Sequence, residues 1–322
     1  MSLILPAAEE LLDSAVVVAL PMRTRFRGIT VREAMVFRGP AGWGEFAPFV
    51  EYDDVESASW LAAGIEAAYL GPPAPQRDRV PVNATVPAIP ADAVPALLAR
   101  YPGATTAKVK VAEPGGTLDE DVARVAVVRE LIPRVRIDAN GNWTVPQAIS
   151  SIRAIGDVEY AEQPCASVEE LAAVRRAVNV PIAADESIRR ATDPLAVVAA
   201  DAADVAVLKV APLGGMRAVL ALTDQIGLPV VISSALDSAI GISAGVAAAA
   251  ALPELVLACG LSTGSLFTTD TAPSFVPQDG AVTVRWFGPD ASISPTVPLA
   301  DPAREQWWHE RLRRCHERLA SS

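Results

Sequence analysis

The stretch Thr106-Ala107-Lys108-Val109-Lys110-Val111 sets two lysines inside an apolar run that is typical of a buried strand. The chain has one further lysine, in the similar run Val205-Ala206-Val207-Leu208-Lys209-Val210, and the rest of its 27 lysines and arginines are arginines. A buried lysine amine can serve as a base, whereas a guanidinium stays charged near neutral pH. Because a charged amine is costly to bury without a partner or a task, both runs predict a functional site.

Around these two runs, short apolar segments alternate with stretches that have room for a helix. This alternation is typical of a parallel α/β architecture, and eight such units over about 180 residues favour a closed (β/α) barrel over an open sheet. The predicted strands are Val82–Thr85, Ala107–Val111, Val135–Ala139, Tyr160–Gln163, Ile182–Asp185, Val205–Val210, Val230–Ser233 and Leu257–Gly260.

The two ends of the chain follow other patterns. A predicted antiparallel meander and a helix occupy the first part, up to a stiff Pro-rich linker, and a strand and an amphipathic helix close the chain. We expect residues 1–79 to form an α+β capping domain, 80–272 the barrel, and 273–322 a segment that packs back on the cap. The predicted elements are Ala15–Leu20, Thr30–Phe37, Gly42–Phe49, Val55–Leu70, the linker Gly71–Pro75, Ala281–Phe287 and Pro302–Leu319.

Composition narrows the class of protein. The net charge of −11 and the pI near 4.8 disfavour a nucleic-acid partner. Three widely spaced cysteines, Cys165, Cys259 and Cys315, indicate a reducing compartment. The first 22 residues lack the basic start of a signal peptide, and the longest apolar run, 239–253, is too short and mild to span a bilayer. We therefore expect a cytoplasmic protein with no membrane partner, and its oligomeric state stays open.

Three acidic residues end consecutive predicted strands. Asp138, Glu162 and Asp185 are spaced by 24 and 23 residues, and Lys209 follows after 24 more. One spacing per β/α unit puts all four at the carboxyl-terminal mouth of the barrel, where barrel enzymes place their chemistry. Converging carboxylates repel one another unless a cation lies between them, and hard oxygen ligands suit Mg²⁺ best and Mn²⁺ next. Taken singly, each acid could instead be a helix N-cap.

The lysines flank this predicted metal site. Because side chains alternate along a strand, Lys108 and Lys110 point to the same side, with Lys110 at the mouth and Lys108 one layer deeper. Lys209, on the sixth strand, lies roughly across the barrel. The sequence therefore predicts a divalent ion with an amine on either side.

These motifs together resemble those of the enolase superfamily, in its muconate-lactonizing-like branch, over nearly the whole chain. The resemblance implies a modified TIM barrel in which three acids hold Mg²⁺, the ion binds a substrate carboxylate, and a lysine removes the adjacent proton. That proton is very weakly acidic, so a cation aimed at the developing charge is what makes its removal feasible. The motifs are Gly42-Trp43-Gly44-Glu45, Lys108-Val109-Lys110, Asp138-Ala139-Asn140, Glu162-Gln163-Pro164, Asp185-Glu186-Ser187 and Leu208-Lys209.

Other residues select a reaction within the superfamily. The only histidines, His309 and His316, lie on the terminal helix, which excludes the branches that use a histidine base. The segment 259–264 lacks the acidic pair that holds the ammonium group in dipeptide epimerases. For Arg136 a pocket-lining role and an ion-paired plug of the barrel remain equal alternatives. The candidate substrate-binding residues are Asn140, Arg136, Ser233, Ser234, Gly260 and Ser262.

The resemblance favours members that remove water from a cyclohexadiene carboxylate to give a benzoate, a step of menaquinone biosynthesis. In that case Lys110 is the single base, Lys209 a fixed cation, and Lys108 a hydrogen-bond donor to the carboxylate or a modulator of Lys110. Racemization of N-succinylamino acids, with Lys110 and Lys209 as paired acid and base, remains an alternative. A catalytically silent barrel that acts as a binding scaffold is a third.

Two cap segments are candidates for a lid that excludes water. Arg23, Arg25 and Arg27, predicted in a loop after the first strand, could cover the tail of the substrate, or they could form a solvated loop. We also expect residues 46–49 to contribute to the lid, and we assign no ligand role to Trp43 or Glu45.

Overall fold

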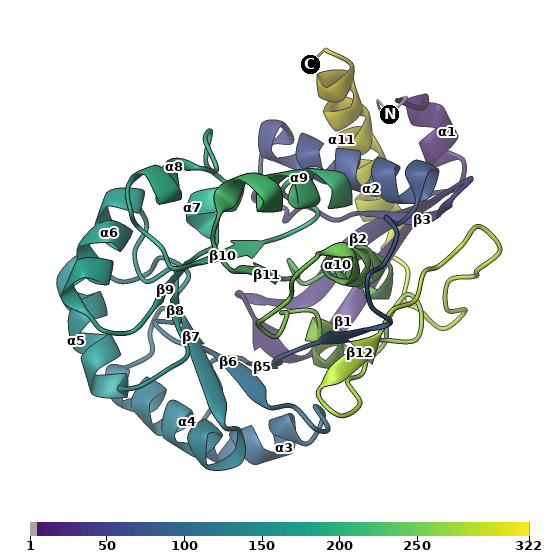
Figure 1. Ribbon diagram of the computed structural model, residues 1–322. Coiled ribbons are helices and arrows are strands. Elements are labelled where there is room, and N and C mark those ends of the chain that lie inside the picture. The colour runs from purple at the N-terminus through teal and green to yellow at the C-terminus, as the bar shows by residue number, and fades with distance from the viewer. Residues whose placement is uncertain (1–4, 322) are drawn as a thin grey trace.

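The computed structural model describes residues 5–321. Its first unit is a three-stranded antiparallel sheet in the order β1-β2-β3, formed by Val16–Phe26, Ile29–Gly39 and Gly42–Phe46. Helix α2, Asp54–Leu70, covers this sheet, and the carboxylate of Asp53 accepts a hydrogen bond from the Glu56 N–H at its start. A short helix α1, Ala8–Leu12, precedes the sheet (Figure 1).

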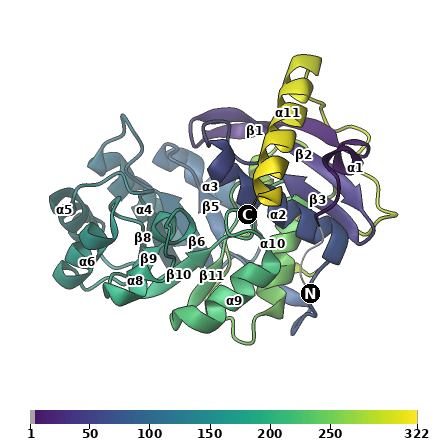
Figure 2. The ribbon, with the colours of Figure 1, turned by 90° about the horizontal axis from the view of Figure 1, so that it is seen from above.

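The second unit is a parallel sheet of seven strands in the order β11-β10-β9-β8-β7-β6-β5. The strands are short and largely buried on both faces, as near-continuous apolar runs require. Figures 1 and 2 show the sheet curled, with helices on its outer side. The strands are β5 Ala84–Val86, β6 Thr106–Lys110, β7 Arg134–Asp138, β8 Ala161–Glu162, β9 Ile182–Ala184, β10 Val205–Leu208 and β11 Val230–Ile232.

The predicted eighth strand, 257–260, is reduced to two bridging residues. Cys259 pairs in parallel with Val82, next to one edge of the sheet, and Gly260 pairs with Ser233, next to the other edge. Next to these bridges, the carbonyl of Ala258 accepts a hydrogen bond from the Arg136 side chain, 2.6 Å away. The parallel α/β architecture is thus confirmed, with single bridges connecting the edges of a curled sheet.

Helices alternate with these strands as the sequence predicts. Thr117, Thr144 and Ser167 each form a capping box with the Glu or Gln three residues later, which fixes where three of the helices begin. The helices are α3 Val94–Leu98, α4 Leu118–Leu131, α5 Val145–Ile155, α6 Val168–Ala177, α7 Glu186–Arg189, α8 Ala196–Ala199, α9 Met216–Ile226 and α10 Ala239–Ala251, with 3-10 turns at Ala91–Ala93 and Thr263–Leu266.

The C-terminal segment contacts both units. Strand β12, Ala281–Thr283, pairs with β4, Arg79–Pro81, so the predicted strand 281–287 is wrong beyond residue 283. Helix α11, Pro302–Ala320, lies against α2 (Figure 2). The guanidinium of Arg311, buried in this contact, donates hydrogen bonds to the cap. Among residues 5–321 no helix is long and apolar enough to cross a membrane.

The first hairpin differs from the prediction. Strand β1 continues to Phe26, so Arg23 and Arg25 belong to a strand and not to a loop. Their side chains are exposed because this end of the hairpin extends past the apolar core of the cap. Arg27 and Gly28 form the turn, both with positive φ, 52° and 77°.

Candidate active site

Strand register brings two of the predicted acids side by side. Lys110 pairs with Asp138 across β6 and β7, and Asp138 pairs with Glu162 across β7 and β8. Asp185 follows β9 directly, at the start of α7. All three carboxylates are buried, with at most 1% of each residue exposed. The carboxyl ends of consecutive strands thus form one buried acidic row.

Each acid of this row contacts a lysine ammonium. Lys108 Nζ lies 2.7 Å from Glu162 Oε1 and 3.1 Å from Asp138 Oδ2. Lys110 Nζ lies 2.5 Å from the same Asp138 oxygen, and Lys209 Nζ pairs with Asp185 Oδ2. Three amines and three carboxylates therefore form one formally neutral network.

The pKa values of the acids follow from burial and from these ammonium groups. Burial alone would raise the pKa of Asp138, but Lys110 and Lys108 more than offset it and hold that pKa below its usual range. For Asp185, burial likewise acts to raise the pKa, but Lys209 and Arg189 together outweigh it and lower the pKa. Burial, reinforced by the charge of Asp138, raises the pKa of Glu162 to about 7. Lys108 lowers the pKa of Glu162 as well, but not enough to offset burial and the charge of Asp138.

The chemistry of this row fits a hard divalent cation. Three carboxylates supply oxygen ligands from neighbouring strands, and Glu162 Oε2 is buried with no hydrogen-bond partner among residues 5–321. Among residues 5–321 no three acidic, cysteine or histidine side chains are gathered closely enough to hold an ion as they stand. Lysine ammonium groups bind the carboxylate oxygens that an ion would take, so the amines must move aside for it.

Two of the proposed binding residues lie on β7 or directly after it. Asn140 is near the row, since its Oδ1 accepts a hydrogen bond of 2.7 Å from Lys110 Nζ. Arg136 is fully buried, pairs with Glu159 at 2.5 Å, and lies over the ring of Tyr160. Because Glu159 comes before β8, the Arg136 side chain points away from the mouth. Of the two alternatives for Arg136, these contacts support the ion-paired plug of the sheet interior.

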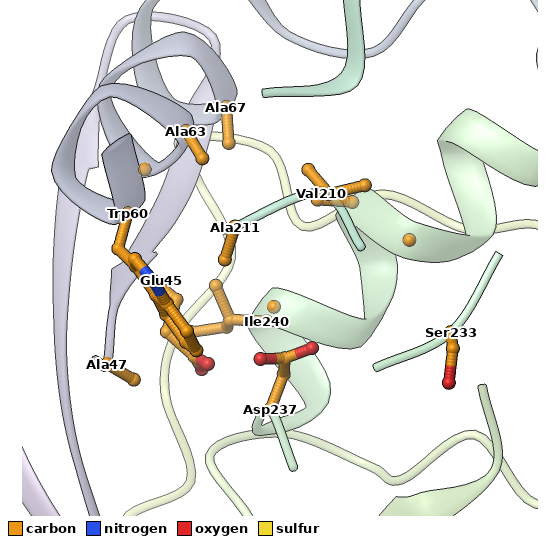
Figure 3. A pocket seen from close by; sticks show the side chains of 14 residues that line it. Glu45, Ala47, Trp60, Ala63, Ala67, Val210, Ala211, Ser233, Asp237 and Ile240 are labelled. Carbon is orange, nitrogen blue, oxygen red and sulfur yellow. The ribbon is translucent and has the colours of Figure 1, made fainter. Parts of the chain in front are cut away.

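The other four proposed binding residues lie around the junction of β11 with residues 260–263. Ser234 Oγ is 2.7 Å from Thr263 Oγ1, and Ser262 Oγ is buried with no hydrogen-bond partner in the part of the chain that the structure describes. Ser233 and Gly260 bridge the two segments. Ser233 also lines a cavity between the cap and the sheet (Figure 3). Hydrogen bonds to the carboxylate row are found for none of these four among the described residues.

Glu45, to which we assigned no ligand role from the sequence, lines the cavity in Figure 3. The buried Glu45 carboxylate accepts hydrogen bonds from the N–H and the hydroxyl of Ser238 at the start of α10. Burial and the nearby Asp237 raise the pKa of Glu45 to about 8. Glu45 therefore joins the cap to the sheet unit, and a Gly-Trp-Gly-Glu turn by itself gives no signal of this contact.

Arg189 and Phe26 are further site residues that the sequence reasoning missed. Arg189 Nε donates to Asp185 Oδ1 at 3.0 Å, and the only sequence signal is its position one helical turn after that acid. The ring of Phe26, at the end of β1, lies 5.5 Å from Lys110 Nζ. The hairpin of the cap therefore reaches the mouth through an aromatic side chain rather than through Arg23 or Arg25.

Comparison with known proteins agrees with this geometry. Residues 92–291 match the family described as enolase C-terminal domain-like, and residues 17–68 match the enolase N-terminal domain-like family. The chain is 58% identical to the o-succinylbenzoate synthase of Mycobacterium tuberculosis, over 99% of this chain and 98% of that protein. It is 59% identical to the o-succinylbenzoate synthase of Mycobacterium leprae, over 98% and 95%.

Solved structures share the fold at lower identity. A muconate lactonizing enzyme from Pseudomonas fluorescens has a TM-score of 0.72 and 22% identity, over 92% of this chain and 97% of that chain. An N-succinyl Arg/Lys racemase from Bacillus cereus has a TM-score of 0.70 and 17% identity, over 93% and 95%.

Proposed function

Because this chain belongs to the enolase superfamily, we propose that it carries out the reaction of its o-succinylbenzoate synthase relatives. The reaction removes water from 2-succinyl-6-hydroxy-2,4-cyclohexadiene-1-carboxylate and gives 2-succinylbenzoate, so the protein is a carbon–oxygen lyase of menaquinone biosynthesis. Identity above half over nearly the whole length, together with the network of lysines and acids at the sheet mouth, carries this conclusion.

Members of this superfamily generally use a divalent metal ion. We assign Asp138, Glu162 and Asp185 as the ligands of Mg²⁺, with Mn²⁺ as the alternative ion, on the basis of their burial and their oxygen donors. The ion would supply the positive charge that stabilises negative charge developing on the substrate carboxylate.

Lys110 is the proposed base. As a free amine, its Nζ takes the ring proton next to the substrate carboxylate, which breaks the C–H bond. The same amine then gives that proton to the departing hydroxyl group, so the C–O bond breaks and water leaves. The position of Lys110 at the outer end of β6, next to Asp138 and Asn140, supports this role.

The other two lysines are proposed to hold charge in place. Lys209, paired with Asp185 on the far side of the row, is a fixed cation that stabilises the electron-rich ring as the proton leaves. Lys108 lies deeper, between Asp138 and Glu162, and donates a hydrogen bond toward the substrate carboxylate or modulates Lys110.

The proposal also includes the closure of the barrel and the division of the chain into a cap, a barrel and a C-terminal segment. We infer a closed barrel of the modified TIM type over residues 80–272, capped by residues 1–79 and joined by the segment 273–322. The bridges from Cys259 and Gly260 to the two edges of the sheet support the closure. Three free, buried cysteines support a cytoplasmic location, which fractionation of the source cells would test.

The proposed reaction is tested with purified protein and the cyclohexadiene precursor. We expect the benzoate absorbance to appear, to be lost on treatment with EDTA, and to return with Mg²⁺ or Mn²⁺. Product formation that EDTA leaves unchanged would refute the metal assignment. No benzoate from a folded, metal-supplied protein would refute the reaction itself.

Racemization of an N-succinylamino acid is a second candidate. It is favoured by the two amines of Lys110 and Lys209, which contact opposite ends of the same acidic row. Incubation of such a substrate in D₂O separates the two reactions, because racemization places deuterium on the α-carbon without releasing water. A silent binding scaffold would retain its function in cells after Lys110→Ala, whereas either enzyme would lose it.

A further inference from the structure

Asp185 is held from two sides. Lys209 pairs with its Oδ2, and Arg189 Nε donates to its Oδ1 at 3.0 Å. The same guanidinium donates from Nη2 to Glu186 Oε1 at 2.7 Å, and its side chain is only 3% exposed. A planar guanidinium with two carboxylate partners has little freedom to rotate. Arg189 therefore sets the orientation of the Asp185 carboxylate.

The third nitrogen of Arg189 reaches the cap. Its Nη1 donates to the hydroxyl oxygen of Tyr52 at 3.3 Å. The two residues are 137 positions apart in the sequence. The same oxygen accepts a hydrogen bond of 2.7 Å from Arg27 Nη2, at the turn of the first hairpin. One hydroxyl thus lies between a guanidinium of the cap and a guanidinium of the sheet unit.

The hairpin turn is itself fixed in place at this point. The Arg27 guanidinium lies 3.9 Å above the ring of Phe49, and Tyr52 packs edge-on against Phe49 and Trp60. The residue before Arg27 is Phe26, whose ring lies 5.5 Å from Lys110 Nζ. The turn therefore lies over the proposed base and is connected to the far end of the acidic row.

We propose that Tyr52 is a positioning residue, which couples the seating of the hairpin on the mouth to the orientation of Asp185 through the chain Arg27–Tyr52–Arg189–Asp185. This inference rests on the proposed function, since Asp185 is there a metal ligand. When the hairpin is seated, the Tyr52 hydroxyl holds Arg189 against Asp185. When this link is cut, Arg189 keeps its bonds to Asp185 and Glu186 but loses its hydrogen bond to Tyr52, and it holds the Asp185 carboxylate less firmly in its direction.

The test removes the hydroxyl alone. Tyr52→Phe keeps the ring contacts with Phe49 and Trp60, so the cap remains packed. We expect Mn²⁺ binding to the substrate-free full-length protein, measured by calorimetry, to weaken by about tenfold, the low end of the effect of losing a residue that orients a metal ligand. KM for the precursor should rise together with it. Tyr69→Phe is the control, because it removes a hydroxyl that donates to Glu10 within the cap, and it should change neither value.

A double-mutant cycle tests the coupling itself. Arg27→Met should weaken Mn²⁺ binding by a similar factor, and the variant that combines it with Tyr52→Phe should be no weaker than either alone, because all three cut one chain. Mn²⁺ affinity of Tyr52→Phe equal to that of the wild type, or factors that simply multiply in the combined variant, would overturn the inference. Absence of Mn²⁺ binding by the wild type would overturn it as well. Because calorimetry needs no turnover, a protein that binds Mn²⁺ in this coupled way but forms no benzoate would refute the proposed reaction and leave the coupling standing.

Discussion

The contact between Glu45 of the cap and Ser238 at the start of α10 should make the free energy of unfolding of this protein fall as pH rises. Glu45 is buried there, and burial together with the charge of Asp237 raises its pKa from 4.5 to about 8. The Arg32 guanidinium lowers this pKa and the Asp270 carboxylate raises it further, and both groups lie near the contact between Glu45 and α10. Between pH 4.5 and 8 the folded protein therefore holds a proton that the unfolded chain has released. A raised acid pKa means that this stability is present at low pH and is lost as pH rises.

The magnitude follows from one proton. Each pH unit inside this window changes the free energy of unfolding by about 1.4 kcal/mol, and the change levels off near the folded pKa. From pH 6 to pH 8 the loss from Glu45 is therefore about 2 kcal/mol. Glu45→Gln supplies a permanently neutral side chain that still accepts hydrogen bonds from Ser238. The variant should gain about 2 kcal/mol on the wild type across this range.

Urea denaturation followed by circular dichroism at pH 6, 7 and 8 measures this difference. Glu33→Gln is the control, since Glu33 is also part of the cap but has the opposite shift. Burial would raise the pKa of Glu33, but hydrogen bonds from Arg304 and Trp308 outweigh it and lower the pKa. Glu33→Gln should therefore lower the free energy of unfolding by the same amount at each of the three pH values. Parallel pH dependence of the wild type and Glu45→Gln would refute the reasoning.

Three further predictions test separate parts of the structure. Lys110→Ala should lower kcat for the proposed dehydration by about 10² to 10⁴-fold in steady-state assays. Lys110→Arg should have a similarly low kcat, because a guanidinium cannot take the proton. Activity of the arginine variant near that of the wild type would contradict the role of base. Arg136→Met should lower the free energy of unfolding in urea by about 3 kcal/mol, because it removes the closer of the two guanidinium partners of the partly buried Glu159. An unchanged urea midpoint would contradict the role of a plug. Gly44→Ala should lower the melting temperature strongly, because a Cβ there would overlap the Gly64 carbonyl of α2. Gly288→Ala, with open space around it, should leave the melting temperature unchanged. Equal melting temperatures of the two variants would show that α2 can move away from β3 at little cost.

The acidic row was predictable because it is built from repeated local units. Asp138 and Glu162 each end a strand, and parallel strands in register place residues one unit apart side by side. The alternation of side chains put Lys108 and Lys110 on one face by the same local rule. The eighth strand is shorter than predicted: Cys259 and Gly260 pair with the two sheet edges, whereas the Ala258 carbonyl accepts a hydrogen bond from a distant side chain, Arg136. Periodicity carries no information on such a distant partner.

The contribution of the cap could not be read from the sequence for the same reason. Glu45 contacts Ser238, 193 residues away, and Tyr52 contacts Arg189, 137 residues away. Neither pair lies in a repeat, and each forms where the cap packs against the sheet unit. Contacts of this kind decide how the proposed base and the carboxylates are covered, although no motif includes them. Substitutions far from any motif, at the turn of the hairpin or at Tyr52, are therefore expected to change the chemistry at the mouth while the acids and lysines stay the same.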